Sequence, residues 1–199
     1  MNYKMQNKKT VYIIPGYEES HRRQPSYKKI AKIFQESGIK SIHIEINWHN
    51  KKPRRFSEYV QQFLMQYKKT KDTNIFVMGF SYGSVIAFLS EPKIKANGII
   101  LCSLSPYFKE DMKNLPEGWI RTWKKDFVDS DYSFSDIAKD IKTKTYILAG
   151  KQEPKACLTR ARSALRKIKD SELILIKNVG HNINHKEYLE GIRDISYRL

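Results

Sequence analysis

The chain is organised around one stretch, Ile75-Phe76-Val77-Met78-Gly79-Phe80-Ser81-Tyr82-Gly83-Ser84-Val85-Ile86-Ala87. Its first four residues are apolar and rich in β-formers, which predicts a buried strand. Gly79 to Gly83 fit the pattern G-x-S-x-G, and a helix-compatible run follows. A strand, a sharp turn and a helix in this order expose the hydroxyl of the central serine at the end of a sheet. We therefore predict that Ser81 is a nucleophile.

The two glycines of this pattern carry a structural requirement of their own. The strand and the helix pass so close at Gly79 and Gly83 that any side chain there must be very small. With 16 serines and 9 glycines in 199 residues, chance predicts roughly 0.03 matches to the pattern. A tight turn with a bystander serine is the alternative interpretation.

The composition is that of a globular protein. Hydrophobic residues make up 40% of the 199 residues and charged residues 29%, which suits a single domain over residues 1–199. The formal net charge is +16, but the basic residues are spread along the chain, so no specific nucleic-acid partner is expected. His21, Arg22 and Arg23 could meet an anionic substrate group, although a solvated loop is the favoured interpretation. Nothing indicates the oligomeric state.

Membrane and metal signals are weak. No apolar run approaches the ~18 residues of a membrane span, and residues 1–9 lack the apolar core of a signal peptide. The two cysteines, Cys102 and Cys157, suggest neither a disulfide framework nor a metal cluster. Cys102 falls in a strand-like run and is expected to be a small buried residue. We expect a cytoplasmic protein without a metal or an organic cofactor.

Short apolar runs alternate with helical patterns along the chain. Such alternation predicts a doubly wound α/β fold, in which about six mostly parallel strands carry helices on both faces. Functional sites in such sheets lie at the carboxyl ends of the strands. The predicted strands are residues 10–14, 41–46, 75–78, 97–104, 143–149 and 172–176. The predicted helices are residues 25–37, 56–67, 82–92, 154–169 and 184–199.

One interval, about 105–142, is too long for an ordinary strand connection. It is rich in aromatic residues and holds two of the three tryptophans, Trp119 and Trp123. A long aromatic insertion after a strand predicts a cap or the wall of an apolar pocket, and the two tryptophans are candidate substrate-binding residues. The alternative is that the rings only fasten a loop to the body.

A serine nucleophile needs a base that takes its proton. His181 follows the predicted sixth strand, on a loop from which an imidazole can reach the serine. We predict that it acts as base and then as acid. A histidine bonded only within its loop is the alternative. The other histidines are weaker candidates, because of their places in a strand, on more distant loops or at a helix start: His43, His21, His49 and His185.

The base needs an acid that orients its ring. Glu153 follows the predicted fifth strand and is the best-placed carboxylate. It could instead be a solvated acid at a helix start, where acidic residues are common. The remaining alternatives are an acid in the insertion, Asp126, Asp129 or Asp131, or a catalytic dyad that lacks a third member.

The reaction also needs hydrogen-bond donors where negative charge develops on the substrate oxygen. The backbone N–H of Tyr82, directly after the nucleophile, is one candidate. The second is the N–H of Tyr17, which follows Pro15-Gly16 after the first strand. An ordinary Pro-Gly turn is the alternative for that segment.

Taken together, these motifs resemble the α/β-hydrolase fold over about 10–199. The resemblance rests on Gly79-Phe80-Ser81-Tyr82-Gly83, the acid after Gly150, Gly180-His181 after the last strand, and the chain order Ser81, Glu153, His181. It implies a sheet of about six strands that lacks the first one or two of a full-length member. Pro15-Gly16 stands where the family often has His-Gly, and Glu153 where aspartate is commoner. The serine also argues against dehalogenases and epoxide hydrolases, which use an aspartate at this position.

The sequence thus predicts a serine hydrolase that cleaves an ester or a thioester of a small acyl substrate through an acyl-enzyme. The same residues could serve an amidase, a peptidase or an acyltransferase. A protein of another class, an inactive basic binding module, is also compatible with the charge. The fold alone does not name a substrate.

Overall fold

A single sheet forms the centre of the molecule. The computed structural model describes residues 8–17, 25–48, 55–69, 73–126 and 132–199, apart from the side chains of 122–126. The six strands lie in the order β2-β1-β3-β4-β5-β6, and all five neighbouring pairs are parallel. Their bounds are β1 Lys8–Ile14, β2 Ile39–His43, β3 Thr73–Phe80, β4 Gly98–Cys102, β5 Lys144–Gly150 and β6 Ser171–Ile176. The predicted six-stranded α/β sheet is confirmed.

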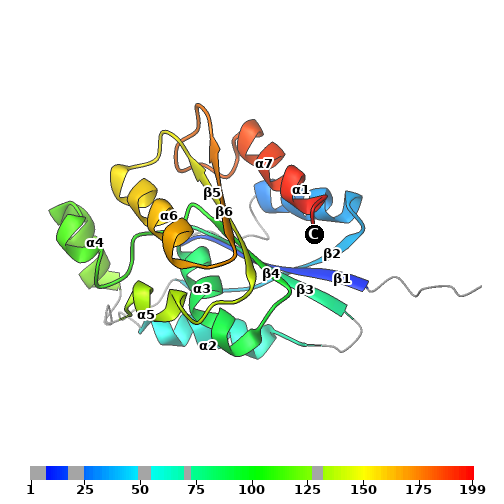
Figure 1. Cartoon of the computed structure of the whole chain (residues 1–199), viewed down its shortest axis with the longest axis horizontal. Coiled ribbons are helices and arrows are strands. Elements are labelled where there is room, and N and C mark those ends of the chain that lie inside the picture. Colours follow the sequence, from blue (N-terminus) through cyan, green and yellow to red (C-terminus); the bar gives the residue numbers. More distant parts are fainter. Residues whose placement is uncertain (1–7, 18–24, 49–54, 70–72, 127–131) are drawn as a thin grey trace, which may run out of the picture.

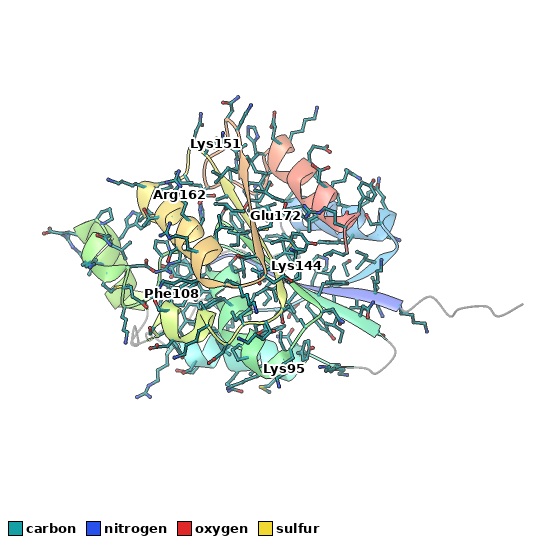
Figure 2. All side chains as sticks on the ribbon, in the orientation of Figure 1. Lys95, Phe108, Lys144, Lys151, Arg162 and Glu172 are labelled. Atoms are coloured by element: carbon teal, nitrogen blue, oxygen red, sulfur yellow. The ribbon has the colours of Figure 1, made fainter. Side chains whose placement is uncertain are left out.

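Helices cover both faces of this sheet (Figure 1). Apolar residues of α1 and α7 form a core with one face, and those of α2, α3, α5 and α6 form a second core with the other. The bounds are α1 Pro25–Glu36, α2 Phe56–Gln66, α3 Tyr82–Ile94, α4 Glu117–Asp126, α5 Phe134–Ala138, α6 Lys155–Lys167 and α7 Lys186–Ser196. Side chains fill the space between the sheet and the helices (Figure 2).

The strand order locates the site. From β1 the chain moves outward to β2, and it then returns to place β3 on the other side of β1. The segments after β1 and β3 therefore lead to helices on opposite faces of the sheet, α1 and α3. Ligands of open α/β sheets bind outside the carboxyl ends of the strands at such a reversal. Ser81 follows β3 directly, so it lies at this point.

The predicted element ends lie within three residues of the observed ones, and the second strand, the helix after Ser81 and the last helix illustrate the differences. The second strand is β2, Ile39–His43, and not 41–46. The helix after Ser81 does not stop near Pro92, because α3 continues to Ile94, whose burial in the core holds the last turn. The last helix begins at Lys186 and not near residue 184. Each difference is two or three residues, as expected where packing rather than local pattern decides the end.

The insertion between β4 and β5 is partly embedded in the body. It contains a short 3₁₀ turn at Met112–Asn114, then α4 and α5. Tyr107, Phe108 and Phe134 are fully buried, and the ring of Phe134 stacks on Phe88 of α3 at 4.5 Å. In the view of Figure 1, α4 lies at the outer edge, away from the sheet. The rings of Tyr107, Phe108 and Phe134 thus attach the insertion to the body of the protein, which agrees with the second of the two interpretations of this segment.

A buried ion pair adds to this attachment. Arg160 of α6 holds Asp111 of the insertion with Nη2 at 2.6 Å and Nε at 3.1 Å from the carboxylate. Only 3% of the Arg160 side chain and 10% of the Asp111 side chain are exposed. The guanidinium also lies over the ring of Phe134, 4.1 Å from its centre, and Phe108 lies beside the same group. The pair therefore couples the insertion to α6.

Replacing Arg160 with alanine is expected to lower the free energy of unfolding by about 3–5 kcal/mol. The change leaves the Asp111 carboxylate buried without its cation. Urea unfolding followed by circular dichroism measures the loss. Lys139→Ala is the matched control, because it breaks the Lys139–Asp136 pair, whose side chains are 66% and 67% exposed, and should cost at most about 0.5 kcal/mol. Equal losses in the two variants would contradict the assigned role of Arg160.

Within the described ranges, no helix has both the length and the apolar character needed to cross a bilayer.

Candidate active site

Ser81 occupies a strained turn between β3 and α3. Its backbone has φ 55° and ψ −120°, a region that residues with a side chain rarely adopt. The backbone N–H of Ser81 donates to the carbonyl of Cys102 at 2.9 Å, which ties the turn to the end of β4. Ser81 is 9% exposed. The turn thus holds the hydroxyl at the carboxyl end of the sheet, where the sequence pattern predicts it.

The two glycines around Ser81 are required by close backbone contacts. A Cβ on Gly79 would lie 2.2 Å from the carbonyl oxygen of Gly83, and a Cβ on Gly83 would lie 2.4 Å from that of Ile14. Neither neighbour is a flexible side chain, so neither can move aside cheaply. The contact at Gly83 also shows that the start of α3 lies against the end of β1. The predicted need for very small residues at both positions is confirmed.

His181 lies within hydrogen-bond distance of the serine. Its Nε2 is 3.0 Å from Ser81 Oγ. The imidazole lies against the ring of Phe80, with the ring centres 5.0 Å apart, and 32% of the His181 side chain is exposed. One face of the ring is therefore supported by the body while the other side reaches solvent.

Glu153 lies behind the imidazole. Its Oε2 is 3.2 Å from His181 Nδ1. Its Oε1 accepts from the N–H of Gly150 at 2.9 Å and from the hydroxyl of Ser103 at 2.6 Å. The carboxylate side chain is 0% exposed. Because Gly150 and Ser103 both donate to Oε1, the carboxylate is held with Oε2 facing His181.

The loops after β5 and β6 are held together by backbone contacts. Lys151 N–H donates to the carbonyl of Ile176 and Gln152 N–H to that of Val179, both at 2.8 Å. A Cβ on Gly150 would lie 2.2 Å from the Val179 carbonyl oxygen, so glycine permits this approach. Glu153 and His181 are therefore brought together by the backbone and not only by their side chains.

Several solved structures superpose on nearly the whole chain. Est1E from Butyrivibrio proteoclasticus, solved with ferulic acid bound, superposes with a TM-score of 0.74 at 14% identity, over 100% of this chain and 90% of Est1E. MenH from S. aureus gives 0.72 at 17% identity, over 97% and 96% of the two chains. The Pyrococcus furiosus esterase Pf2001 gives 0.67 at 16%, over 96% and 83%. No protein-family model and no curated protein matches the sequence.

The chain has the α/β-hydrolase fold. At 14–17% identity these likenesses show the fold, and a fold by itself does not fix the chemistry of a site.

The two residues predicted to supply the oxyanion donors, Tyr82 and Tyr17, contact each other through their rings. Tyr82 is the first residue of α3, and the first N–H groups of a helix have no partner inside it. The rings of Tyr17 and Tyr82 lie 5.8 Å apart. The N–H of Gly16 donates to the hydroxyl of Tyr27 at 2.9 Å, so Gly16 is engaged and the amide of Tyr17 stays the candidate.

Sequence reasoning missed several polar residues around Ser81, His181 and Glu153. Ser103 turns the chain after β4 with φ 50°, and besides Glu153 it contacts the hydroxyl of Tyr188 at 2.8 Å. Ser105 Oγ lies 3.1 Å from Ser81 Oγ. Both serines follow the carboxyl end of β4, so the rule that points to strand ends marks their segment, but it does not reveal which residues they contact. No sequence signal marks Tyr27 or Tyr188.

The remaining predicted residues stand apart from the contacts described above or lie outside the described part of the chain. Trp119 lies on α4 and is 40% exposed, and the side chain of Trp123 is outside the described part of the chain, so their role in substrate binding stays a prediction. His43 ends β2, and His185 precedes α7 with its Nδ1 2.6 Å from Glu187. The remaining candidates lie outside the described residues or side chains: His21, Arg22, Arg23, His49, Asp126, Asp129 and Asp131.

One group among the described residues has the donor set of a metal site. Glu153, Cys157 and His181 each bring a ligand atom, all within 4.8 Å of one another. Glu153 and His181 already face each other at hydrogen-bond distance, and burial raises the pKa of the Cys157 thiol to about 12. At neutral pH the thiol is therefore protonated and is not a ready metal ligand. Cys102 is buried and free, as predicted.

Proposed function

We propose that this protein is a serine hydrolase that cleaves a carboxylic ester or a thioester through an acyl-enzyme on Ser81. The observation that carries the proposal is the continuous line of Ser81 Oγ, His181 and Glu153, with separations of 3.0 and 3.2 Å. Several proteins of the same fold are named as esterases or hydrolases, which supports a hydrolase in general. Ester or thioester specificity is the finer part of the proposal.

Acylation begins when His181 Nε2 takes the proton of Ser81 and Oγ attacks the acyl carbon. Glu153 accepts from Nδ1 and so keeps Nε2 free to receive that proton. The tetrahedral intermediate carries its negative charge on the former carbonyl oxygen, where the amides of Tyr17 and Tyr82 would donate to it. His181 then gives its proton to the leaving alcohol or thiol, and the acyl group stays on Ser81.

Deacylation repeats these steps with water. His181 takes a proton from water, whose oxygen attacks the acyl carbon. The bond from carbon to Ser81 Oγ breaks, Oγ recovers the proton from His181, and a carboxylic acid leaves. Residues of this chain thus supply the nucleophile, the base, the orienting acid and the oxyanion donors. In this proposal Trp119 and Trp123 contact the acyl or alcohol part of a small-molecule substrate.

The proposal is tested by intact-mass labelling with a fluorophosphonate probe, which reacts with activated serines. We expect one adduct on the wild type and none on Ser81→Ala. A panel of p-nitrophenyl esters, acyl-CoA thioesters and aminoacyl anilides then separates esterase, thioesterase and amidase activity. Product analysis with added alcohols would reveal acyl transfer. A folded wild type that neither labels nor turns over any of these substrates would overturn the proposal.

Glu153→Gln is expected to reduce kcat/KM by about 10²-fold, less than the loss of the nucleophile or the base. The amide can donate to His181 Nδ1, which favours the tautomer whose Nε2 carries a proton and cannot accept from Ser81. Steady-state kinetics measure the loss. Glu172→Gln, which alters an exposed ion pair with Arg198, is the matched control and should leave activity unchanged. If Glu153→Gln behaves like Glu172→Gln, the orienting acid lies elsewhere.

A further inference from the structure

Ser105 is a second hydroxyl at the reacting atom. It follows β4, and its Oγ lies 3.1 Å from Ser81 Oγ. Ser105 is 6% exposed, so its hydroxyl has little access to solvent. The same Ser81 oxygen lies 3.0 Å from His181 Nε2. Ser81 therefore sits between an imidazole and a second serine.

Proton counting determines which serine donates. Glu153 as a carboxylate only accepts, so His181 Nδ1 must carry the proton of the neutral imidazole. Nε2 is then an acceptor, and the single proton of Ser81 goes to it. The oxygen of Ser81 has no further proton to give, so the contact with Ser105 requires Ser105 to donate.

From this geometry we infer that Ser105 is a further catalytic residue, a hydrogen-bond donor to Ser81 Oγ that speeds the breakdown of the acyl-enzyme. This inference rests on the proposed acyl-enzyme mechanism and adds a group to it. In deacylation the bond from the acyl carbon to Oγ breaks, and its electron pair goes to Oγ. A donor already aimed at that oxygen stabilises the growing negative charge until His181 returns the proton.

Acylation should depend less on this contact. A donor on Oγ favours removal of the serine proton, but it also withdraws electron density from the oxygen that must attack. These two effects oppose each other when the bond to carbon forms. They do not oppose each other when that bond breaks and Oγ departs. The inference therefore predicts a selective effect on one half of the reaction.

The test uses the purified full chain and stopped-flow kinetics with p-nitrophenyl acetate. In Ser105→Ala we expect deacylation to slow about tenfold, the cost of one hydrogen bond to a partly charged oxygen. The acylation rate and the rate of fluorophosphonate labelling should change less than about threefold. Quenched samples should then show more acyl-enzyme by intact mass than the wild type. Ser105→Thr keeps the hydroxyl and should restore deacylation.

Ser103→Ala is the matched control, because Ser103 lies two residues away and donates to Glu153 instead of Ser81. Ser103 can affect the reaction by way of Glu153 and the orientation of His181, which serves both steps. Acylation and deacylation should therefore slow together in Ser103→Ala. The inference would be overturned if Ser105→Ala slowed both steps equally or left the kinetics unchanged. In either case, fluorophosphonate labelling of the wild type would leave the proposed function standing. A wild type that neither labels nor forms an acyl-enzyme would overturn both.

Discussion

Ser81→Ala is expected to lower kcat by ~10³-fold or more and to abolish the fluorophosphonate adduct. The variant removes the oxygen that His181 Nε2 contacts at 3.0 Å, so the proposed acyl-enzyme cannot form. The residual rate would come from substrate binding and oxyanion stabilisation alone. Steady-state kinetics on the best ester or thioester, together with intact-mass spectra, measure both effects.

The control for this variant is Ser90→Ala in α3, the helix that follows Ser81. Ser90 is also buried, but its hydroxyl donates to the carbonyl of Ile86, within α3, at 2.7 Å. It should keep full labelling and turnover, with at most a small change in thermal unfolding. Ser81→Ala should melt close to the wild type, because its hydroxyl is not part of the core. Near-wild-type turnover in a folded Ser81→Ala protein would mean that another residue is the nucleophile.

His181→Ala is expected to have a loss of similar size, ~10³-fold or more in kcat, with Ser81 still present. Without the imidazole nothing takes the serine proton, and Glu153 has no ring to orient. Fluorophosphonate labelling should slow together with turnover, because the probe also needs the activated hydroxyl. Added imidazole should restore part of the activity, since the site of the removed ring is 32% exposed in the native protein.

His185→Ala serves as the matched histidine variant. His185 lies four residues further on and faces Glu187 rather than Ser81, so its removal should leave kcat within about twofold. If His181→Ala retains turnover while His185→Ala loses it, the assignment of the base is wrong. If the two variants lose activity equally and unfold at lower urea, the effect is one of stability.

Much of the site could be predicted because it follows from local patterns. The need for glycine on either side of Ser81 can be predicted from the sequence, because a strand that turns directly into a helix leaves no room for a Cβ at Gly79 or Gly83. His181 and Glu153 could be found because both follow apolar runs that read as strands, and parallel strands end at one edge of a sheet. The alternation of strands and helices likewise predicted the sheet.

The residues that sequence reasoning missed depend on contacts between distant segments. The hydroxyls that contact Glu153 and Ser81 belong to Ser103 and Ser105, which lie 50 and 24 residues away from their partners. In the sequence, Arg160 resembles the other basic residues of predicted helices. The tertiary structure is needed to show that it pairs with Asp111 in the interior. The continuation of α3 past Pro92 is of the same kind, because burial of Ile94 outweighs a local helix-breaking signal.

The sequence by itself determined the α/β class, the strained turn at Ser81 and the three residues of the proposed triad. These features follow from hydrophobic period, steric limits on the backbone and the position of polar residues after strands, all of which act over a few residues. The tertiary structure alone decided the strand order, the second hydroxyl at Ser81, the donors on Glu153 and the ion pair under the insertion. These features depend on how helices and loops pack across the sheet. The stabilising free energy there comes from contacts between segments that are distant in the sequence, so no single segment indicates it.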